Sequence, residues 1–138
     1  MTSEKLNIPV DEYTSRDPVT VDLGASYGDI EHLFKEHGFR HLPVLQDGEV
    51  VGIISERNLK LPSDLGKAAE LTAQDIMTPG PHTVSLNTPL SEVVFSMSSY
   101  KIGSVIITDE NRKMIGIFTD TDALNALVEI LRGDLPEA

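Results

Sequence analysis

The pattern of apolar and polar positions occurs twice along the chain. A shift of 63 positions aligns residues of the same class, pairing Pro18 with Pro81, Thr20 with Thr83, Val21 with Val84 and Leu23 with Leu86. After one extra residue near Arg112 the shift becomes 64, and Gly52 then coincides with Gly116. Internal repetition of this kind indicates two copies of one supersecondary unit.

Both copies predict the same order of elements. A short strand at 20–21 or 83–84 is followed by a helix, because apolar residues recur at helical spacing from Tyr27 to Phe34 and from Leu90 to Met97. Two apolar runs joined by turn residues then predict a hairpin in each copy: 41–45 with 50–54, and 103–107 with 114–118. A second helix closes each unit. It is long before Gly133 and weak in the first copy, where Pro62 interrupts it.

Each unit is therefore β-α-β-β-α, and the fold class is α/β (α+β). Because about 60 residues bury too little surface for a comfortably stable domain, we expect the repeats to pack sheet to sheet about a pseudo-two-fold axis, with helices outside and ligand clefts between them. The expected parts are an N-terminal segment at 1–10, a first repeat at 11–60, a linker at 61–73 that is partly helical over 65–71, a second repeat at 74–132 and a tail at 133–138.

The composition argues against several classes of function. The 11 Lys and Arg against 22 Asp and Glu give a net charge of −11, which disfavours nucleic acid as a partner. No apolar stretch is long enough to span a membrane and no secretion signal opens the chain, so we expect a cytoplasmic protein. There is no cysteine, and His32 and His37 are five apart on one predicted helix, so we expect no metal site.

Three sequence segments of the second copy resemble those of a known family. They are residues 75–78 ahead of Thr83 and Val84, the run 102–107, and the run 116–122. In this order and with this repetition, residues 11–131 closely resemble a pair of CBS domains. The resemblance implies a Bateman module, which commonly dimerises, binds AMP, ATP, S-adenosylmethionine or related nucleotides in its clefts, and performs no chemistry there.

The strand-to-helix junction of the second copy is the main candidate site. Thr119 and Asp122 have the spacing of a helix capping box, which accounts for them locally. We also expect the helix N-terminus to offer free N–H groups to a phosphate. The resemblance adds that Thr119 contacts phosphate and Asp122 accepts from both ribose hydroxyls, and the two interpretations are compatible.

Other site residues follow from the same resemblance. Arg40 and His41 stand where the family has a basic pair that reaches phosphates, and the second copy has Gly103 and Ser104 there. The adenine is expected beside the first strand of a repeat. The expected nucleotide site consists of Thr83, Val84, Ser104, Thr119, Thr121, Asp122, Arg40 and His41.

A second site is expected to be weaker. The first copy has Ser55 and Asn58 at the capping positions, and the neutral amide of Asn58 must use a donor where a carboxylate would only accept. Arg57 could clamp a phosphate, although an exposed arginine is more often solvated. This possible site consists of Thr20, Val21, Pro43, Ser55, Arg57 and Asn58.

These features favour a regulatory sensor of AMP, ADP or ATP that signals to an as yet unidentified regulated protein or through its oligomeric state. We expect no catalytic residues and no catalytic cofactor, with Mg²⁺ only if ATP is bound, because the phosphate-binding glycine loops of nucleotide enzymes are absent. The apolar positions Leu124, Leu127 and Leu131 favour a homodimer. Three alternatives stay open: a ligand-free interaction module, S-adenosylmethionine or NAD as the ligand, and a catalyst acting on a nucleotide.

Overall fold

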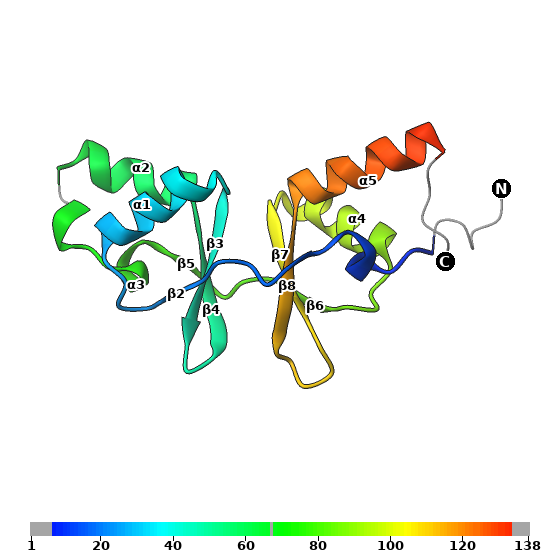
Figure 1. The fold of residues 1–138 in the computed structure, drawn as a ribbon, viewed down its shortest axis with the longest axis horizontal. Helices are drawn as coiled ribbons and strands as arrows, with labels where there is room; N and C mark the ends of the chain where they lie inside the picture. Colours follow the sequence, from blue (N-terminus) through cyan, green and yellow to red (C-terminus); the bar gives the residue numbers. More distant parts are fainter. Residues whose placement is uncertain (1–6, 67, 134–138) are drawn as a thin grey trace. The chain divides into compact units, whose positions relative to one another are not determined.

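The computed structural model describes residues 7–66 and 68–133, which form two compact units (Figure 1). The central unit is residues 18–81. The C-terminal unit combines the N-terminal segment up to Asp17 with the chain from His82 onward. Each unit contains one four-stranded sheet. The expected N-terminal segment and tail lie largely outside the described residues.

The sheet of the central unit has the strand order β2-β3-β4-β5, with β2 parallel to β3 and the other pairs antiparallel. Its elements in chain order are β2 (Val21–Asp22), α1 (Tyr27–His37), β3 (His41–Gln46), β4 (Glu49–Ser55), α2 (Glu56–Asp64), a 3-10 helix η3 (Ala68–Glu70), α3 (Ala73–Ile76) and β5 (Thr78–Pro79).

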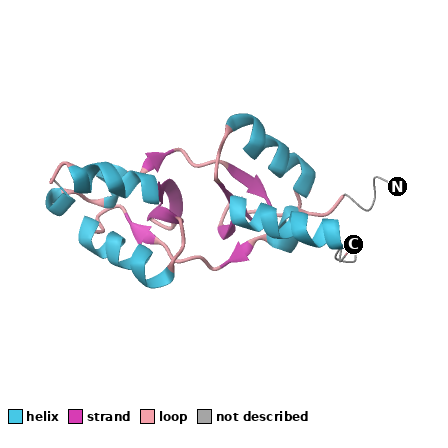
Figure 2. Cartoon of the chain, turned by 90° about the horizontal axis from the view of Figure 1, so that it is seen from above, coloured by secondary structure: helices cyan, strands magenta, loops and turns pink. Residues whose placement is uncertain are grey.

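The C-terminal unit repeats this plan, with the strand order β1-β8-β7-β6 and β6 parallel to β7. Its elements are a 3-10 helix η2 (Val10–Tyr13), β1 (Ser15–Arg16), β6 (Thr83–Ser85), α4 (Leu90–Tyr100), β7 (Ser104–Thr108), β8 (Met114–Thr119) and α5 (Asp120–Arg132). Both views show helices beside the strands within each unit (Figures 1 and 2). The β-α-β-β-α order predicted for each repeat is confirmed. None of the helices within 7–66 and 68–133 has the length and apolar character needed to cross a membrane.

Apolar faces of the predicted helices form a separate core in each unit. In the central unit, Tyr27, Ile30 and Phe34 of α1 pack with Leu42, Val44 and Ile54 of the hairpin. The core of the C-terminal unit contains Ile8, Val10, Leu90, Val93, Met97, Val105, Ile107, Phe118 and Ala126. Each core thus joins residues from both ends of its repeat, which gives the strand-to-helix junctions a fixed support.

The compact units divide the chain differently from the expected repeat bounds. Residues 11–17, expected in the first repeat, lie in the C-terminal unit, because Val10 fills its core and β1 pairs with β8. The end of the expected linker and the residues up to Pro81 lie in the central unit, where α3 and β5 complete the structure. Each sheet therefore has an edge strand of two residues that the sequence pattern did not predict.

The second helix of the first repeat is longer than expected. Pro62 lies inside α2, which continues to Asp64, so the prediction that proline ends this helix was wrong. Proline removes one backbone donor of the helix. Packing compensates, because Leu59 is buried and its carbonyl accepts a 2.6 Å hydrogen bond from the hydroxyl of Tyr27.

A glycine in the neighbouring strand allows each edge strand to approach closely. A Cβ atom on Gly116 of β8 would lie 2.5 Å from the carbonyl oxygen of Ser15 and 2.6 Å from Cγ2 of Thr14. A Cβ atom on Gly52 of β4 would meet the side chain of Met77 and lie 3.0 Å from the carbonyl oxygen of Thr78. Gly116 is therefore required by space, because the nearest atom is backbone, whereas at Gly52 the flexible side chain of Met77 is the closest obstacle.

We expect Gly116→Ala to destabilise the C-terminal unit by about 1–3 kcal/mol, because β1 must move away from β8. Gly28→Ala is the matched control, since a Cβ atom there would have nothing within 4 Å and alanine suits a helix better than glycine. Urea unfolding of both variants measures the difference. Equal stability of Gly116→Ala and the wild type would contradict the tight packing of β1.

Tyr13 gives the contact between η2 and α5 a dependence on pH. Its hydroxyl donates a 2.7 Å hydrogen bond to Glu129. Desolvation, that hydrogen bond and the charges of Glu129 and Glu12 raise its pKa from 10.0 to about 12. The stabilisation that the protonated Tyr13 hydroxyl gives the folded protein is complete below pH 10. It is lost as the pH rises toward 12, because the unfolded chain releases the tyrosine proton at a lower pH than the folded protein does.

We therefore expect wild-type protein to be more stable than Tyr13→Phe at pH 9, and this difference to shrink steadily up to pH 12. The measurement is the free energy of unfolding of both proteins at each pH. If the difference in unfolding free energy between the two proteins stays constant from pH 9 to pH 12, the hydrogen bond from Tyr13 to Glu129 does not contribute to stability.

Candidate functional site

The junction between β8 and α5 is an N-terminal cap built around one carboxylate. Oδ2 of Asp122 accepts hydrogen bonds from the backbone N–H of Thr119 at 2.9 Å and from its hydroxyl at 3.1 Å. The hydroxyl of Thr119 in turn accepts from the N–H of Asp122 at 3.4 Å. The predicted capping box is confirmed. It holds the carboxylate of Asp122 in one orientation at the end of the strand.

The first turn of α5 does not offer the free donors that we expected for a phosphate. The N–H of Asp120 donates to the carbonyl of Gly103 at 3.0 Å, and the N–H of Thr121 donates to Oδ1 of Asp120 at 2.9 Å. The third N–H, from Asp122, belongs to the cap. That expectation was wrong for this structure, since three successive donors of the helix end are satisfied within the chain. A ligand at this junction would therefore meet side chains and not free backbone donors.

Ser15 completes the surroundings of Asp122 and was missed by sequence reasoning. Its hydroxyl donates a 3.1 Å hydrogen bond to Oδ1 of Asp122, from the edge strand β1. The repeat contains a signal for it, because the shift of 63 positions that aligns Pro18 with Pro81 also aligns Ser15 with Thr78. Each edge strand thus carries a hydroxyl at the same place.

The central unit has the same arrangement with an amide in place of the carboxylate. Oδ1 of Asn58 accepts from the N–H of Ser55 at 2.7 Å and from its hydroxyl at 2.8 Å, and Nδ2 of Asn58 donates to the hydroxyl of Thr78 at 3.4 Å. An amide oxygen has two lone pairs, and both are used here. Asn58 therefore has no acceptor left for a ribose hydroxyl, whereas its second amide hydrogen can still donate.

A third junction has the same cap at a position where the sequence predicted no ligand. Oδ2 of Asp75 accepts from the N–H of Thr72 at 2.9 Å and from its hydroxyl at 3.0 Å, at the start of the four-residue helix α3. The contacts match those of Thr119 and Asp122 closely. What distinguishes the β8–α5 junction is the extra hydroxyl donated by Ser15.

Strand pairing brings further predicted residues to these junctions. Ser104 of β7 lies opposite Thr119 of β8, and His41 of β3 lies opposite Ser55 of β4. The side chain of His41 is half-buried and engaged in an interaction of its own. Within each unit, a predicted site residue is thus next to the capping residue.

The remaining predicted residues differ in exposure. Val84 and Val21 are half-buried against the cores of their units, as is expected of strand residues whether or not they also contact a ligand. Pro43 is fully buried, because it lies between β3 residues of the core, so it offers no surface to a ligand in this structure. The exposed candidates are Thr83, Thr121, Arg40 and Arg57, and Thr20 is half-buried.

A hollow in the described part of the chain lies outside the two predicted sites. It measures about 360 Å³ and lies between α1 and α2 of the central unit, with Tyr27, Phe34 and Leu59 among charged residues including Lys35 and Lys60. It contains none of the predicted site residues. The hollow is a shallow opening between two helices, whereas ligand sites are usually enclosed clefts, so the junctions remain the candidate site.

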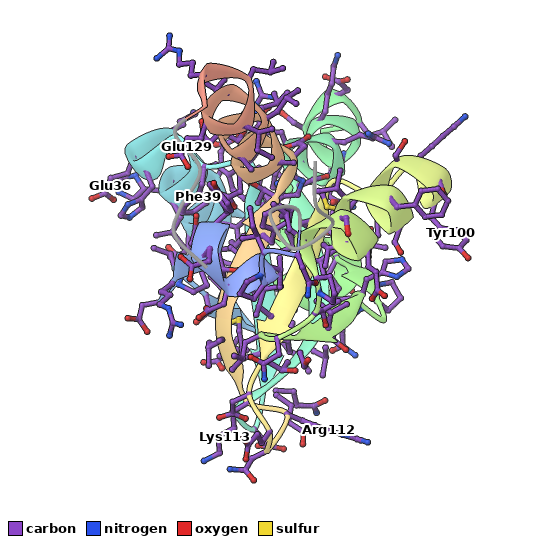
Figure 3. All side chains as sticks on the ribbon, turned by 90° about the vertical axis from the view of Figure 1, so that its right-hand side faces the viewer. Glu36, Phe39, Tyr100, Arg112, Lys113 and Glu129 are labelled. Atoms are coloured by element: carbon purple, nitrogen blue, oxygen red, sulfur yellow. The ribbon has the colours of Figure 1, made fainter. Side chains whose placement is uncertain are left out.

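The helices of the C-terminal unit expose apolar side chains. On α5, Leu124, Leu127 and Leu131 are 61%, 48% and 76% exposed. On α4, Phe95 and Tyr100 are 72% and 73% exposed, and Figure 3 shows Tyr100 projecting outward while Arg112 and Lys113 lie at the tip of the β7–β8 hairpin. The sequence pattern pointed to the α5 residues and did not single out Phe95 or Tyr100.

Comparison with known proteins identifies the repeat. The family model described as CBS domain matches residues 10–61 and 73–129. An uncharacterised protein of Methanocaldococcus jannaschii is 30% identical over 130 residues, which are 86% of this chain and 46% of that protein. The chain thus spans less than half the length of this relative.

Two solved structures resemble this one over most of their length. The CBS domain pair of protein MJ0100, in complex with 5′-methylthioadenosine and S-adenosyl-L-methionine, has a TM-score of 0.77 at 26% identity and covers 92% of this chain and 98% of its own. CBSX2 in complex with AMP also has a TM-score of 0.77 at 26% identity, with 90% and 98% covered.

Proposed function

This chain belongs to the CBS domain family, and on that basis we propose that it is a regulatory module that binds an adenosine nucleotide at the β8–α5 junction. The observation that carries the proposal is the carboxylate of Asp122, which is oriented by two hydrogen bonds from Thr119 and keeps acceptor capacity on its second oxygen. A carboxylate accepts hydrogen bonds and does not donate, so it suits the vicinal hydroxyls of a ribose. The two solved CBS pairs described above, one with AMP and one with S-adenosyl-L-methionine, support an adenosine-type ligand.

The other predicted residues take roles around this carboxylate. We assign Ser104, which lies opposite Thr119 on the paired strand, and the exposed Thr121 to polar contacts with the phosphate. Thr119 holds the carboxylate, because its hydroxyl hydrogen is donated to Asp122. Thr83 and Val84 of β6 would meet the adenine. The phosphate contacts rest on hydroxyl groups, because the backbone donors of the first turn of α5 are already engaged.

A phosphorylated ligand is favoured by the sequence, through basic residues that all belong to the central unit and not to the β8–α5 junction. Arg40 and Arg57 are exposed in the central unit, and His41 lies next to Ser55. Guanidinium groups bind phosphate with charge-assisted hydrogen bonds, whereas the sulfonium and amino-acid tail of S-adenosylmethionine need no cluster of cations. We therefore propose AMP, ADP or ATP, with Mg²⁺ only alongside ATP, as a regulatory ligand and not a substrate.

The second candidate function is protein interaction without a ligand. It is favoured by the exposed leucines of α5, which in an isolated molecule would leave an apolar face in water. A thermal-shift series with AMP, ADP, ATP, NAD and S-adenosylmethionine separates the two functions. Ligand at about 100 times its dissociation constant should stabilise a binding protein by about 2.7 kcal/mol. Absence of any shift at millimolar concentration would leave interaction as the better proposal.

We expect Asp122→Ala to abolish most binding of the nucleotide that gives the largest shift, because the ribose loses its acceptor. Asp75→Ala is the matched control, since it removes a capping carboxylate with the same two contacts to Thr72. Each change should cost about 1 kcal/mol of stability through loss of the cap. Isothermal titration calorimetry then measures binding by both variants.

Of the two variants, only Asp122→Ala should bind the nucleotide more weakly than the wild type. Native affinity in Asp122→Ala would remove the proposed site from the β8–α5 junction. An equal loss in both variants would show that the effect comes from helix stability and not from contact with the ligand.

We further propose that the α5 leucines form the interface of a homodimer. Leu124→Asp should shift the protein toward monomer, because it places a charge in the apolar face. Leu65→Asp is the control, since Leu65 in the central unit is also 61% exposed. Sedimentation equilibrium measures the mass of each protein. A wild type that is monomeric at high concentration, or a dimer unaffected by Leu124→Asp, would contradict this interface.

A further inference from the structure

Asp122 has few acceptor positions left for a ligand. A carboxylate offers about four lone-pair positions, two on each oxygen. Oδ2 already accepts twice, from the backbone N–H and the hydroxyl of Thr119, and Oδ1 accepts once from the hydroxyl of Ser15. One position remains, on Oδ1. A ribose presents two adjacent hydroxyls, so full recognition requires one of the existing donors to leave.

Of the three donors, the Ser15 hydroxyl is the one that can leave at the lowest cost. The backbone N–H of Thr119 cannot turn, and the hydroxyl of Thr119 also accepts from the N–H of Asp122, which ties it to the helix cap. Ser15 is exposed on a strand of two residues, so its hydroxyl can turn to water without exposing a buried group.

We propose that Ser15 is a specificity-determining residue of the nucleotide site and sets how strongly Asp122 prefers ribose over deoxyribose. In the free protein its hydroxyl occupies the acceptor position that the second ribose hydroxyl needs. A nucleotide with two hydroxyls must displace it, and a nucleotide with one hydroxyl uses the position that is already open. This inference rests on the proposed nucleotide function and adds a role for β1 that the sequence motif does not contain.

The central unit provides an internal comparison. Thr78 occupies the place of Ser15 but accepts a hydrogen bond from Nδ2 of Asn58 rather than donating one. The oxygen of Asn58 has no acceptor position left. Removing the hydroxyl of Thr78 therefore frees no acceptor for a ribose, although it makes the same kind of change on the equivalent strand.

The test compares AMP with 2′-deoxyadenosine monophosphate by calorimetry. Ser15→Ala should bind AMP about fivefold more tightly than the wild type, which corresponds to one net hydrogen bond that no longer has to be broken. Its affinity for the deoxynucleotide should be unchanged. Ser15→Thr keeps a hydroxyl and should retain the wild-type ratio of the two affinities, and Thr78→Ala should do the same.

The outcomes separate this inference from the function on which it rests. If the wild type binds AMP and the ratio of affinities is the same in Ser15→Ala, only the role of Ser15 is refuted. A parallel loss of both affinities in Ser15→Ala, with a lower melting temperature, would make Ser15 a structural support of β1 and also refute it. If the wild type binds neither nucleotide nor ATP at millimolar concentration, the proposed function and the inference both fail.

Discussion

The packing of a short edge strand over a glycine is the constraint on which each unit depends. β1 and β5 have only two residues each, too few to hold a place in a sheet by hydrogen bonds alone. They lie close because Gly116 and Gly52 have no side chain to keep them away. The edge strand then delivers a hydroxyl, from Ser15 or Thr78, to the fourth residue of the neighbouring strand-to-helix junction. The same edge strand thus completes the sheet and supplies a hydroxyl to the polar junction.

Much of the fold could be predicted because it depends on local periodicity. Helices α1, α4 and α5 and the two hairpins follow from apolar spacing, and the 63-residue shift predicts that they occur twice. The edge strands could not be predicted in this way, since two residues carry no period. Their partners are also remote, as Ser15 pairs with Ile117. Pro62 misled the prediction for a related reason, because burial of Leu59 outweighs the local helix-breaking signal.

The contacts of the candidate site also differ in whether the sequence could predict them, according to how far apart the partners lie in the chain. The contacts of Thr119 with Asp122 span three residues and could be read directly from the spacing. The contact of Ser15 with Asp122 spans 107 residues, and the engaged N–H of Asp120 depends on Gly103 across the sheet. Interactions of this second kind decide how many donors and acceptors remain for a ligand. The sequence therefore predicted the capping contacts of the candidate site better than the donors and acceptors that the site leaves for a ligand.

A single exchange of carboxylate for amide makes the two units chemically unequal. In both, the capping residue sends two donors to one oxygen of the fourth residue. In Asp122 the second oxygen remains an acceptor, which Ser15 only partly uses. In Asn58 the second atom is a nitrogen, so the hydrogen bond to the edge strand reverses and Thr78 becomes the acceptor. The same backbone arrangement thus leaves an acceptor in the C-terminal unit and only a donor in the central unit, so the role proposed for Asp122 has no counterpart at Asn58.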